Sequence, residues 1–387
     1  MKERTLSVEL PEALEAWLFS SLRGNFSVFP DGVPERDLKR FAQFTDDTGI
    51  QPFLRHRLKE TGGLKTCPVV LQQAFDRRRL MEVIVHSLRK KELLRIIEAF
   101  HEARVRMLIL KGAALSYLVY PEPNLRTCCD VDVFVDPKET NAADTVLRSL
   151  GYERTGRLNF ETTYARDDQG VEHVLDLHWK LSNSQFFSGK FDFEEIYERS
   201  VPVCALSPRA RALDAVDSLI NACIHMAGHR TWDRLIWLTD VYLLHGLLSN
   251  AQFDEFVTRA VNKRLGAVCL EALRITQKVY GLELSHPAMK HLIDQESIMA
   301  GGFRKNDPSV YLLELDRDYI YEFSRLMLES SWGDRFRLLR KALFPPLSEL
   351  NGRYDTRSRI KLPFIYLYRI MIKLPGILIL GRKGKSE

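Results

Sequence analysis

The chain has 387 residues, of which 45% are hydrophobic and 28% are charged, and its formal net charge is +5. These proportions are typical of a globular protein and exclude wholesale disorder, and the length allows two or three domains. After residue 352, nine basic residues face only two acidic ones. The remainder of the chain is close to neutral, so we expect no general nucleic-acid binding.

The cysteines and the chain ends predict a cytoplasmic protein. None of the six cysteines forms a Cys-x-x-Cys pair, and the first residues contain no apolar signal region. The apolar segment 362–380 is interrupted by Arg369 and Lys373, so it does not predict a membrane span. Basic residues flank an apolar stripe in residues 360–380, which fits either a closing helix or peripheral contact with the inner membrane face.

The first third of the chain predicts helices and then a strand. Helical spacing up to about residue 57 is broken at residues 29–32, and a long amphipathic helix is expected over residues 69–103. The short apolar run 107–110 predicts a strand that stops at a Lys-Gly turn. Helical character resumes over residues 113–119.

The middle of the chain predicts further strands, and the rest predicts helices. A strand is expected over residues 131–135, followed by a helix over 137–150 and two strands around the turn at 167–170. From about residue 190 onward we expect only helices. The predicted fold class is therefore α+β, with a mixed β-sheet core, flanking helices and an α-helical C-terminal domain. The expected segments are a helical lead-in (residues 1–75), a core (76–190), a helical domain (191–350) and a basic amphipathic tail (351–387).

Two predicted strands carry acidic side chains. Asp130 and Asp132 are two residues apart, which places both carboxylates on one face of the first strand. Asp176 and His178 share a face of the second strand in the same way. Closely spaced carboxylates repel unless a cation neutralises them, and hard oxygen ligands suit Mg²⁺ or Mn²⁺. The sequence therefore predicts a metal site if the two strands are neighbours.

Basic residues near these strands suit a phosphate. Lys111 and Gly112 open a helix directly after a strand, where free backbone amides attract anions. Arg126 lies four residues before Asp130 and could grip phosphate oxygens with its planar guanidinium. The alternative for each of these two basic residues is that it is an ordinary solvated charge at the surface.

Together these motifs resemble a known bacterial family. Leu110-Lys111-Gly112, Arg126, the Asp-x-Asp strand and Leu-Asp-Leu-His-Trp at residues 175–179 are similar to the uncharacterised nucleotidyltransferases of the DNA polymerase beta-like nucleotidyltransferase superfamily. The likeness continues through residues 225–229, which begin and end with His225 and His229, and through Trp-Leu-Thr-Asp, which ends at Asp240.

This resemblance implies an enzyme with a nucleotidyltransferase-like core. The expected reaction transfers a nucleoside monophosphate from Mg·NTP to the hydroxyl of an unidentified small molecule, saccharide, peptide or protein. Asp130, Asp132 and Asp176 would act as catalytic metal ligands, while Lys111, Gly112, Arg126 and His178 would bind the nucleotide.

Three further alternatives remain open. His225, His229 and Asp240 could line the cleft, although the two histidines also fit half of a zinc site or ordinary packing. The Asp-x-Asp motif also occurs in metal-dependent glycosyltransferases that bind nucleotide sugars. A degenerate nucleotide-binding or scaffold protein that has lost turnover is the non-enzymatic hypothesis.

Overall fold

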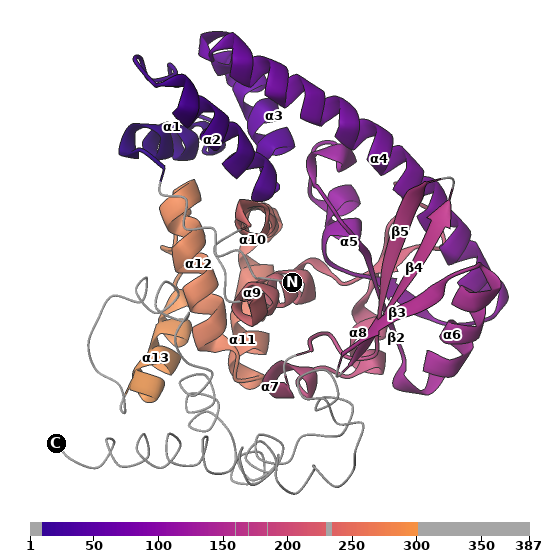
Figure 1. The fold of residues 1–387 in the computed structure, drawn as a ribbon. Coiled ribbons are helices and arrows are strands. Elements are labelled where there is room, and N and C mark those ends of the chain that lie inside the picture. Colours follow the sequence, from indigo (N-terminus) through magenta and orange to yellow (C-terminus); the bar gives the residue numbers. More distant parts are fainter. Residues whose placement is uncertain (1–9, 159, 169, 184, 230–233, 301–387) are drawn as a thin grey trace, which may run out of the picture. The chain divides into compact units, whose positions relative to one another are not determined.

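The computed structural model describes residues 10–158, 160–168, 170–183, 185–229 and 234–300 (Figure 1). Residues up to Leu292 belong to one compact unit, and a second unit begins at Ile293. The tail predicted at residues 360–380 lies outside the described residues. Within the described residues, no helix is long and apolar enough to cross a membrane.

Helices make up the first part of the chain, as the sequence predicted. They are α1 (Glu12–Leu22), α2 (Glu35–Asp47), α3 (Gln51–Thr61), the short 3₁₀ helix η1 (Gly63–Thr66) and α4 (Val69–Glu102). Proline immediately precedes α1, α2 and α4, where its fixed φ and missing N–H suit a helix start. The long helix predicted over residues 69–103 is confirmed to within one residue.

The apolar rhythm of α4 is not buried along its whole length. Phe75 packs near its beginning and Phe100 near its end, and both are fully buried. Between them Leu80, Ile84 and Leu88 are exposed, with exposed fractions of 62%, 48% and 37%. The helix thus spans the distance between two packed regions, the N-terminal helices and the sheet (Figure 1).

A seven-stranded mixed sheet follows in the order β3-β4-β5-β2-β1-β7-β6. Its strands are β1 (Met107–Ile109), β2 (Val131–Val135), β3 (Glu153–Arg157), β4 (Glu161–Asp168), β5 (Val171–His178), β6 (Val201–Pro202) and β7 (Arg211–Ala212). Central strands β2 and β5 run parallel, whereas β1 is antiparallel to β2. The expectation of helices only after residue 190 was wrong, because β6 and β7 extend the sheet beyond β1.

Helices also lie between the strands along the chain. They are α5 (Lys111–Leu118), η2 (Pro123–Leu125), η3 (Pro137–Glu139), α6 (Thr140–Ser149), α7 (Gln185–Ser188) and α8 (Phe193–Arg199). Alternate residues of β2 and β5, such as Val133 and Leu175, pack against α4 and α6 in one core cluster. The predicted core-facing side of both strands is therefore confirmed, and the acidic residues lie on the opposite face.

Four of the remaining described helices form a bundle: α9 (Ala215–His229), α10 (Leu235–Leu247), α11 (Asn250–Asn262) and α12 (Gly266–Tyr280). The last described helix, α13 (Met289–Ala300), begins in the first compact unit and continues into the second. Helix α9 contacts α10, α11 and α12, and it also contacts α5 (Figure 1). Since α5 begins at the Lys111-Gly112 turn, α9 connects the bundle with the acidic face of the sheet.

Candidate active site

Asp132 and Asp176 lie directly opposite each other on the parallel strands β2 and β5. Residues paired in this way project from the same face of a sheet. The sequence predicted that the two strands would be neighbours, and the pairing confirms it. Asp130 differs from the prediction, because β2 begins at Val131 and Asp130 occupies the bend before it.

His178 completes the group on this face. Its Nε2 lies 2.7 Å from Asp132 Oδ1, and its Nδ1 lies 3.2 Å from Glu161 Oε2. The ring is 1% exposed; its Nε2 is hydrogen-bonded to Asp132, whereas its Nδ1 is close to Glu161 but makes no hydrogen bond among the described residues. Glu161 in turn accepts a hydrogen bond from the Asn183 side chain. A histidine with one nitrogen toward an acidic cluster and the other on a carboxylate has the arrangement of many metal-ligating histidines.

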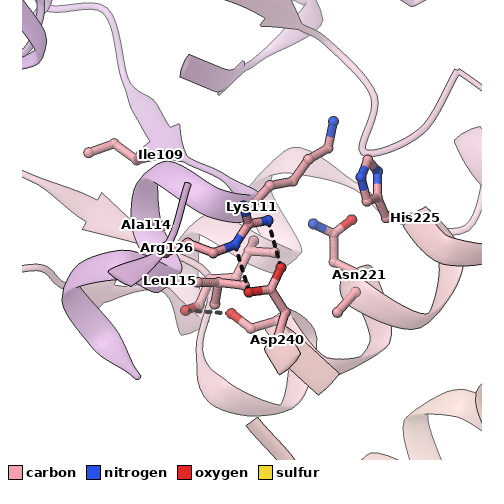
Figure 2. A pocket seen from close by; sticks show the side chains of 11 residues that line it. Ile109, Lys111, Ala114, Leu115, Arg126, Asn221, His225 and Asp240 are labelled. Atoms are coloured by element: carbon pink, nitrogen blue, oxygen red, sulfur yellow. Dashed lines mark hydrogen bonds and ion pairs between the residues drawn. The ribbon is translucent and has the colours of Figure 1, made fainter. Parts of the chain in front are cut away.

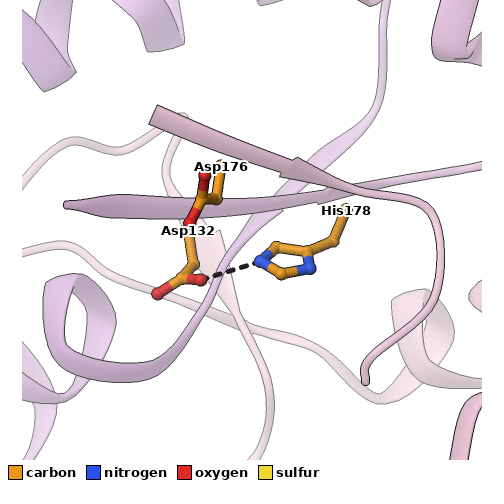
Figure 3. Close-up of side chains that lie close together, drawn as sticks. All are labelled: Asp132, Asp176 and His178. Atoms are coloured by element: carbon orange, nitrogen blue, oxygen red, sulfur yellow. Dashed lines mark hydrogen bonds and ion pairs between the residues drawn. The ribbon is translucent and has the colours of Figure 1, made fainter. Parts of the chain in front are cut away.

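The donor set of this cluster fits a divalent cation. One ligand atom from each of Asp132, Asp176 and His178 lies within 4.8 Å of the other two (Figure 3). Asp176 Oδ1 is buried and has no hydrogen-bond partner among the described residues. An unpartnered buried carboxylate oxygen is costly, and a bound cation would remove that cost. Carboxylates suit Mg²⁺ and Mn²⁺, while imidazole nitrogen is commoner around transition metals.

Lys111 balances the charge of this cluster. Its Nζ donates a hydrogen bond of 2.7 Å to Asp132 Oδ1. The backbone reaches this position because Leu110 N bonds to Asp132 O, which continues the β1–β2 pairing by one residue. Lys111 then adopts a φ of +48°, a left-handed conformation uncommon for a residue with a Cβ atom. Strained backbone of this kind is concentrated at functional sites.

Gly112 is required by a close approach of two chain segments. A Cβ atom at this position would lie 2.7 Å from Cys128 Sγ and 3.1 Å from Arg126 Cζ. The turn before α5 therefore packs directly on the segment that leads into β2. This contact holds Lys111 and Asp132 at a fixed separation.

The carboxylates of the site differ in their proton affinity. Burial, together with the nearby Asp132 and Asp176, raises the pKa of Asp130 to about 6. Burial also acts to raise the pKa of Asp132, but Lys111 and His178 outweigh it and hold that pKa well below its usual range. Asp132 is consequently ionised at neutral pH, as a metal ligand must be.

Arg126 is held by another part of the chain. Its Nε and Nη2 donate hydrogen bonds of 2.8 and 2.7 Å to the two carboxylate oxygens of Asp240 on α10. Tyr120 donates a third, of 2.7 Å, to Asp240 Oδ1. Arg126 and Asp240 are 6% and 4% exposed. This buried pair ties the segment before β2 to the helical bundle.

The other residues singled out from the sequence lie around α9. His225 lines a small pocket with Lys111, Arg126 and Asp240 (Figure 2). Its ring packs edge-on against Trp237. His229 is the last residue of α9, and its side chain lies outside the described residues. The cleft-lining role of these residues stays a prediction.

Sequence reasoning missed Glu161 and Asn221. Glu161 pairs with His178 in the β4–β5 hairpin, where Asp168 pairs with Val171 across the turn. Counting back from that turn gives the Glu161 pairing, so the predicted hairpin contained the signal. Asn221 has no such local signal, because the pocket that it lines is formed by residues distant in the chain, such as Lys111 and Asp240.

Fold and site together define a class of protein. A mixed sheet presents two aspartates and a histidine beside a lysine-glycine turn, and this group of side chains could hold a divalent cation. The family model described as "Uncharacterised nucleotidyltransferase" matches residues 34–281, more than half of the chain. The chain belongs to this family, and its general activity is nucleotidyl transfer. No curated protein and no solved structure matches the chain significantly.

Proposed function

We propose that the protein transfers a nucleoside monophosphate from an NTP to an acceptor hydroxyl and that it depends on Mg²⁺ or Mn²⁺. The observation that carries this proposal is the in-register pair Asp132 and Asp176, in which Asp176 Oδ1 is buried without a partner. A buried carboxylate oxygen without a partner is costly, and a bound cation would remove that cost.

Asp132, Asp176 and His178 would hold the cation, and Asp130 would approach it from the bend before β2. A divalent cation bound there supplies positive charge to the reacting phosphate. Glu161 orients His178 by keeping Nε2 toward the two aspartates. This role differs from the nucleotide-binding role that the sequence suggested for His178, because the ring points into the acidic cluster.

Lys111 and the beginning of α5 would bind the phosphates. The Lys111 ammonium contacts Asp132 and can exchange this partner for a phosphate oxygen when a cation neutralises the aspartate. The amides of Gly112 and Ala113 belong to the first turn of α5, where backbone N–H groups favour anions. Arg126 would support this turn through packing on Gly112, since Asp240 and the Thr127 carbonyl already occupy its nitrogens.

In the proposed step the acceptor oxygen forms a bond to the α-phosphorus, and the bond to the β-phosphate oxygen breaks. Pyrophosphate leaves, and the acceptor proton moves to a carboxylate. Asp176 is the residue proposed to receive it, through the carboxylate oxygen that does not hold the cation.

Transfer of label from NTPs tests this proposal. The full chain is incubated with cell extract and each NTP labelled at the α- or the γ-phosphate, and the wild type is compared with Asp132→Asn. We expect an acceptor to gain α-label in the wild type only. Transfer of γ-label would indicate a kinase, and transfer from a labelled UDP-sugar would favour the glycosyltransferase hypothesis. No transfer from any donor would support the degenerate scaffold.

The acceptor and the site of action in the cell are also proposals. The helical bundle adjoins the site through α9 and is the natural surface for selecting an acceptor. A cytoplasmic protein remains the proposal, and residues 351–387 fit either a closing helix of the helical domain or peripheral membrane contact. Flotation with anionic vesicles, lost on truncation after residue 350, would support that contact.

A further inference from the structure

A pocket separate from the acidic cluster lies between α5 and α9. Its polar lining residues are Lys111, Arg126, Ser218, Asn221, His225 and Asp240 (Figure 2). Its volume is about 20 Å³, enough for about one non-hydrogen atom such as the oxygen of a water or hydroxyl group.

Asn221 lines this pocket, and its side-chain oxygen Oδ1 has no hydrogen-bond partner among the described residues. The residue is 3% exposed, and this oxygen is buried. In Figure 2 the amide lies between the Arg126–Asp240 pair and His225. Leaving a buried polar atom unpaired costs about 1–3 kcal/mol, so an external group that bonds to Asn221 would recover that energy.

The neighbouring polar groups already have partners. Ser218 donates to the Leu213 carbonyl, and Arg126 and Asp240 bind each other. The Lys111 ammonium is bound to Asp132, although its side chain lines the pocket. Asn221 Oδ1, in contrast, is a buried polar atom of the pocket lining that still requires a partner.

We infer that Asn221 binds a ribose hydroxyl of the nucleotide. The free Oδ1 atom of Asn221 can only accept a hydrogen bond, and a hydroxyl group can donate one. A charged group is disfavoured because Arg126 and Asp240 neutralise each other beside the amide. The inference rests on the proposed function, in which the Lys111 ammonium binds a phosphate of the nucleotide. Since the Lys111 side chain also lines the pocket, we place the ribose on the pocket side of this lysine.

Comparison of ribo- and deoxynucleotides tests this inference. Calorimetry with Mn²⁺ measures binding of ATP, GTP, CTP and UTP and of their 2′-deoxy and 3′-deoxy counterparts to the full chain. We expect the wild type to bind a ribonucleotide about 3- to 10-fold more tightly than one of its deoxy forms, the range for one hydrogen bond. Asn221→Leu, of similar shape but without polar atoms, should bind all three forms equally.

Ser218→Ala is the matched control, because Ser218 lines the same pocket but bonds to the backbone. It should keep the preference of the wild type. Asn221→Leu should melt no lower than the wild type, since it removes an unsatisfied polar atom. A wild type without preference, or a preference that survives Asn221→Leu, would overturn the inference while leaving nucleotidyl transfer intact. Failure of the wild type to bind any NTP would instead remove the proposed function and this inference with it.

Discussion

Arg126 and Asp240 are 114 residues apart in the chain and form a buried, bidentate ion pair. Arg126 belongs to the segment before β2, and Asp240 belongs to the helical bundle. Thr127 adds a hydrogen bond from the same segment to the Gly49 carbonyl between α2 and α3. Three regions of the chain therefore meet next to the candidate active site.

Loss of one member of this pair should be severe. Asp240→Asn leaves the Arg126 charge buried without its counterion, and we expect the free energy of unfolding to fall by about 3–5 kcal/mol. Urea denaturation measures the change. The double variant Arg126→Met with Asp240→Leu should lose less than Asp240→Asn alone, because it leaves no buried charge. Equal or greater loss in the double variant would show that the pair contributes more than charge compensation.

Gly112→Ala should destabilise the turn that carries Lys111. The added Cβ atom would lie 2.7 Å from Cys128 Sγ, so we expect a loss of about 1–3 kcal/mol in urea denaturation. Cys128→Ala in the same chain should restore part of it. Gly246→Ala on α10 is the control, because nothing lies within 4 Å of its Cβ position and the helix should gain about 0.5–1 kcal/mol. Similar losses at both positions would refute the steric argument.

Glu92 on α4 should make stability depend on pH. Burial acts to raise its pKa, but hydrogen bonds from Arg95 and Tyr152 and the charge of Arg166 outweigh it, so the pKa lies below its usual value of 4.5. An acid with a lowered folded pKa stabilises the protein above its unfolded pKa, and this contribution is lost as the pH falls through the folded pKa. Glu92→Gln should therefore cost on the order of 2 kcal/mol at pH 7. The difference from the wild type should shrink below pH 4.5, and a constant difference would contradict the assignment.

Glu161→Gln should weaken metal binding without unfolding the protein. Glu161 keeps the Nε2 atom of His178 directed at Asp132, and loss of such an orienting carboxylate typically costs 10- to 100-fold in metal affinity. Titration of the purified chain with Mn²⁺ measures the effect. Unchanged Mn²⁺ affinity would mean that Glu161 does not orient His178 for metal binding or that His178 does not ligate the cation.

Local patterns were sufficient for most of the fold. The period-two alternation of residues 131–135 and 171–178 predicted two strands with a common acidic face, and both are present. That Asp132 lies directly opposite Asp176 could not be derived from the sequence, because nothing within either strand fixes the register between the two strands. Strands β6 and β7 have two residues each, too few to show any alternation.

Long-range contacts account for what the sequence could not supply. Arg126 looked like a free phosphate ligand because its partner, Asp240, follows 114 residues later. Asp130 was placed on the strand because it continues the alternation of β2, yet the backbone bends at this residue before pairing with β5 starts at Val131. Both differences follow from tertiary contacts that no window of sequence contains.

Binding of Mn²⁺ to the full chain, followed by electron paramagnetic resonance, tests the central claim most directly. The account predicts that Asp176→Asn lowers Mn²⁺ affinity at least about 10-fold, because it removes a ligand from the Asp132, Asp176 and His178 cluster. Glu172→Gln removes the same charge from an exposed position on the same strand and should bind Mn²⁺ like the wild type. Equal Mn²⁺ affinity in the wild type, Asp176→Asn and Glu172→Gln would contradict the metal site and the proposed function that depends on it.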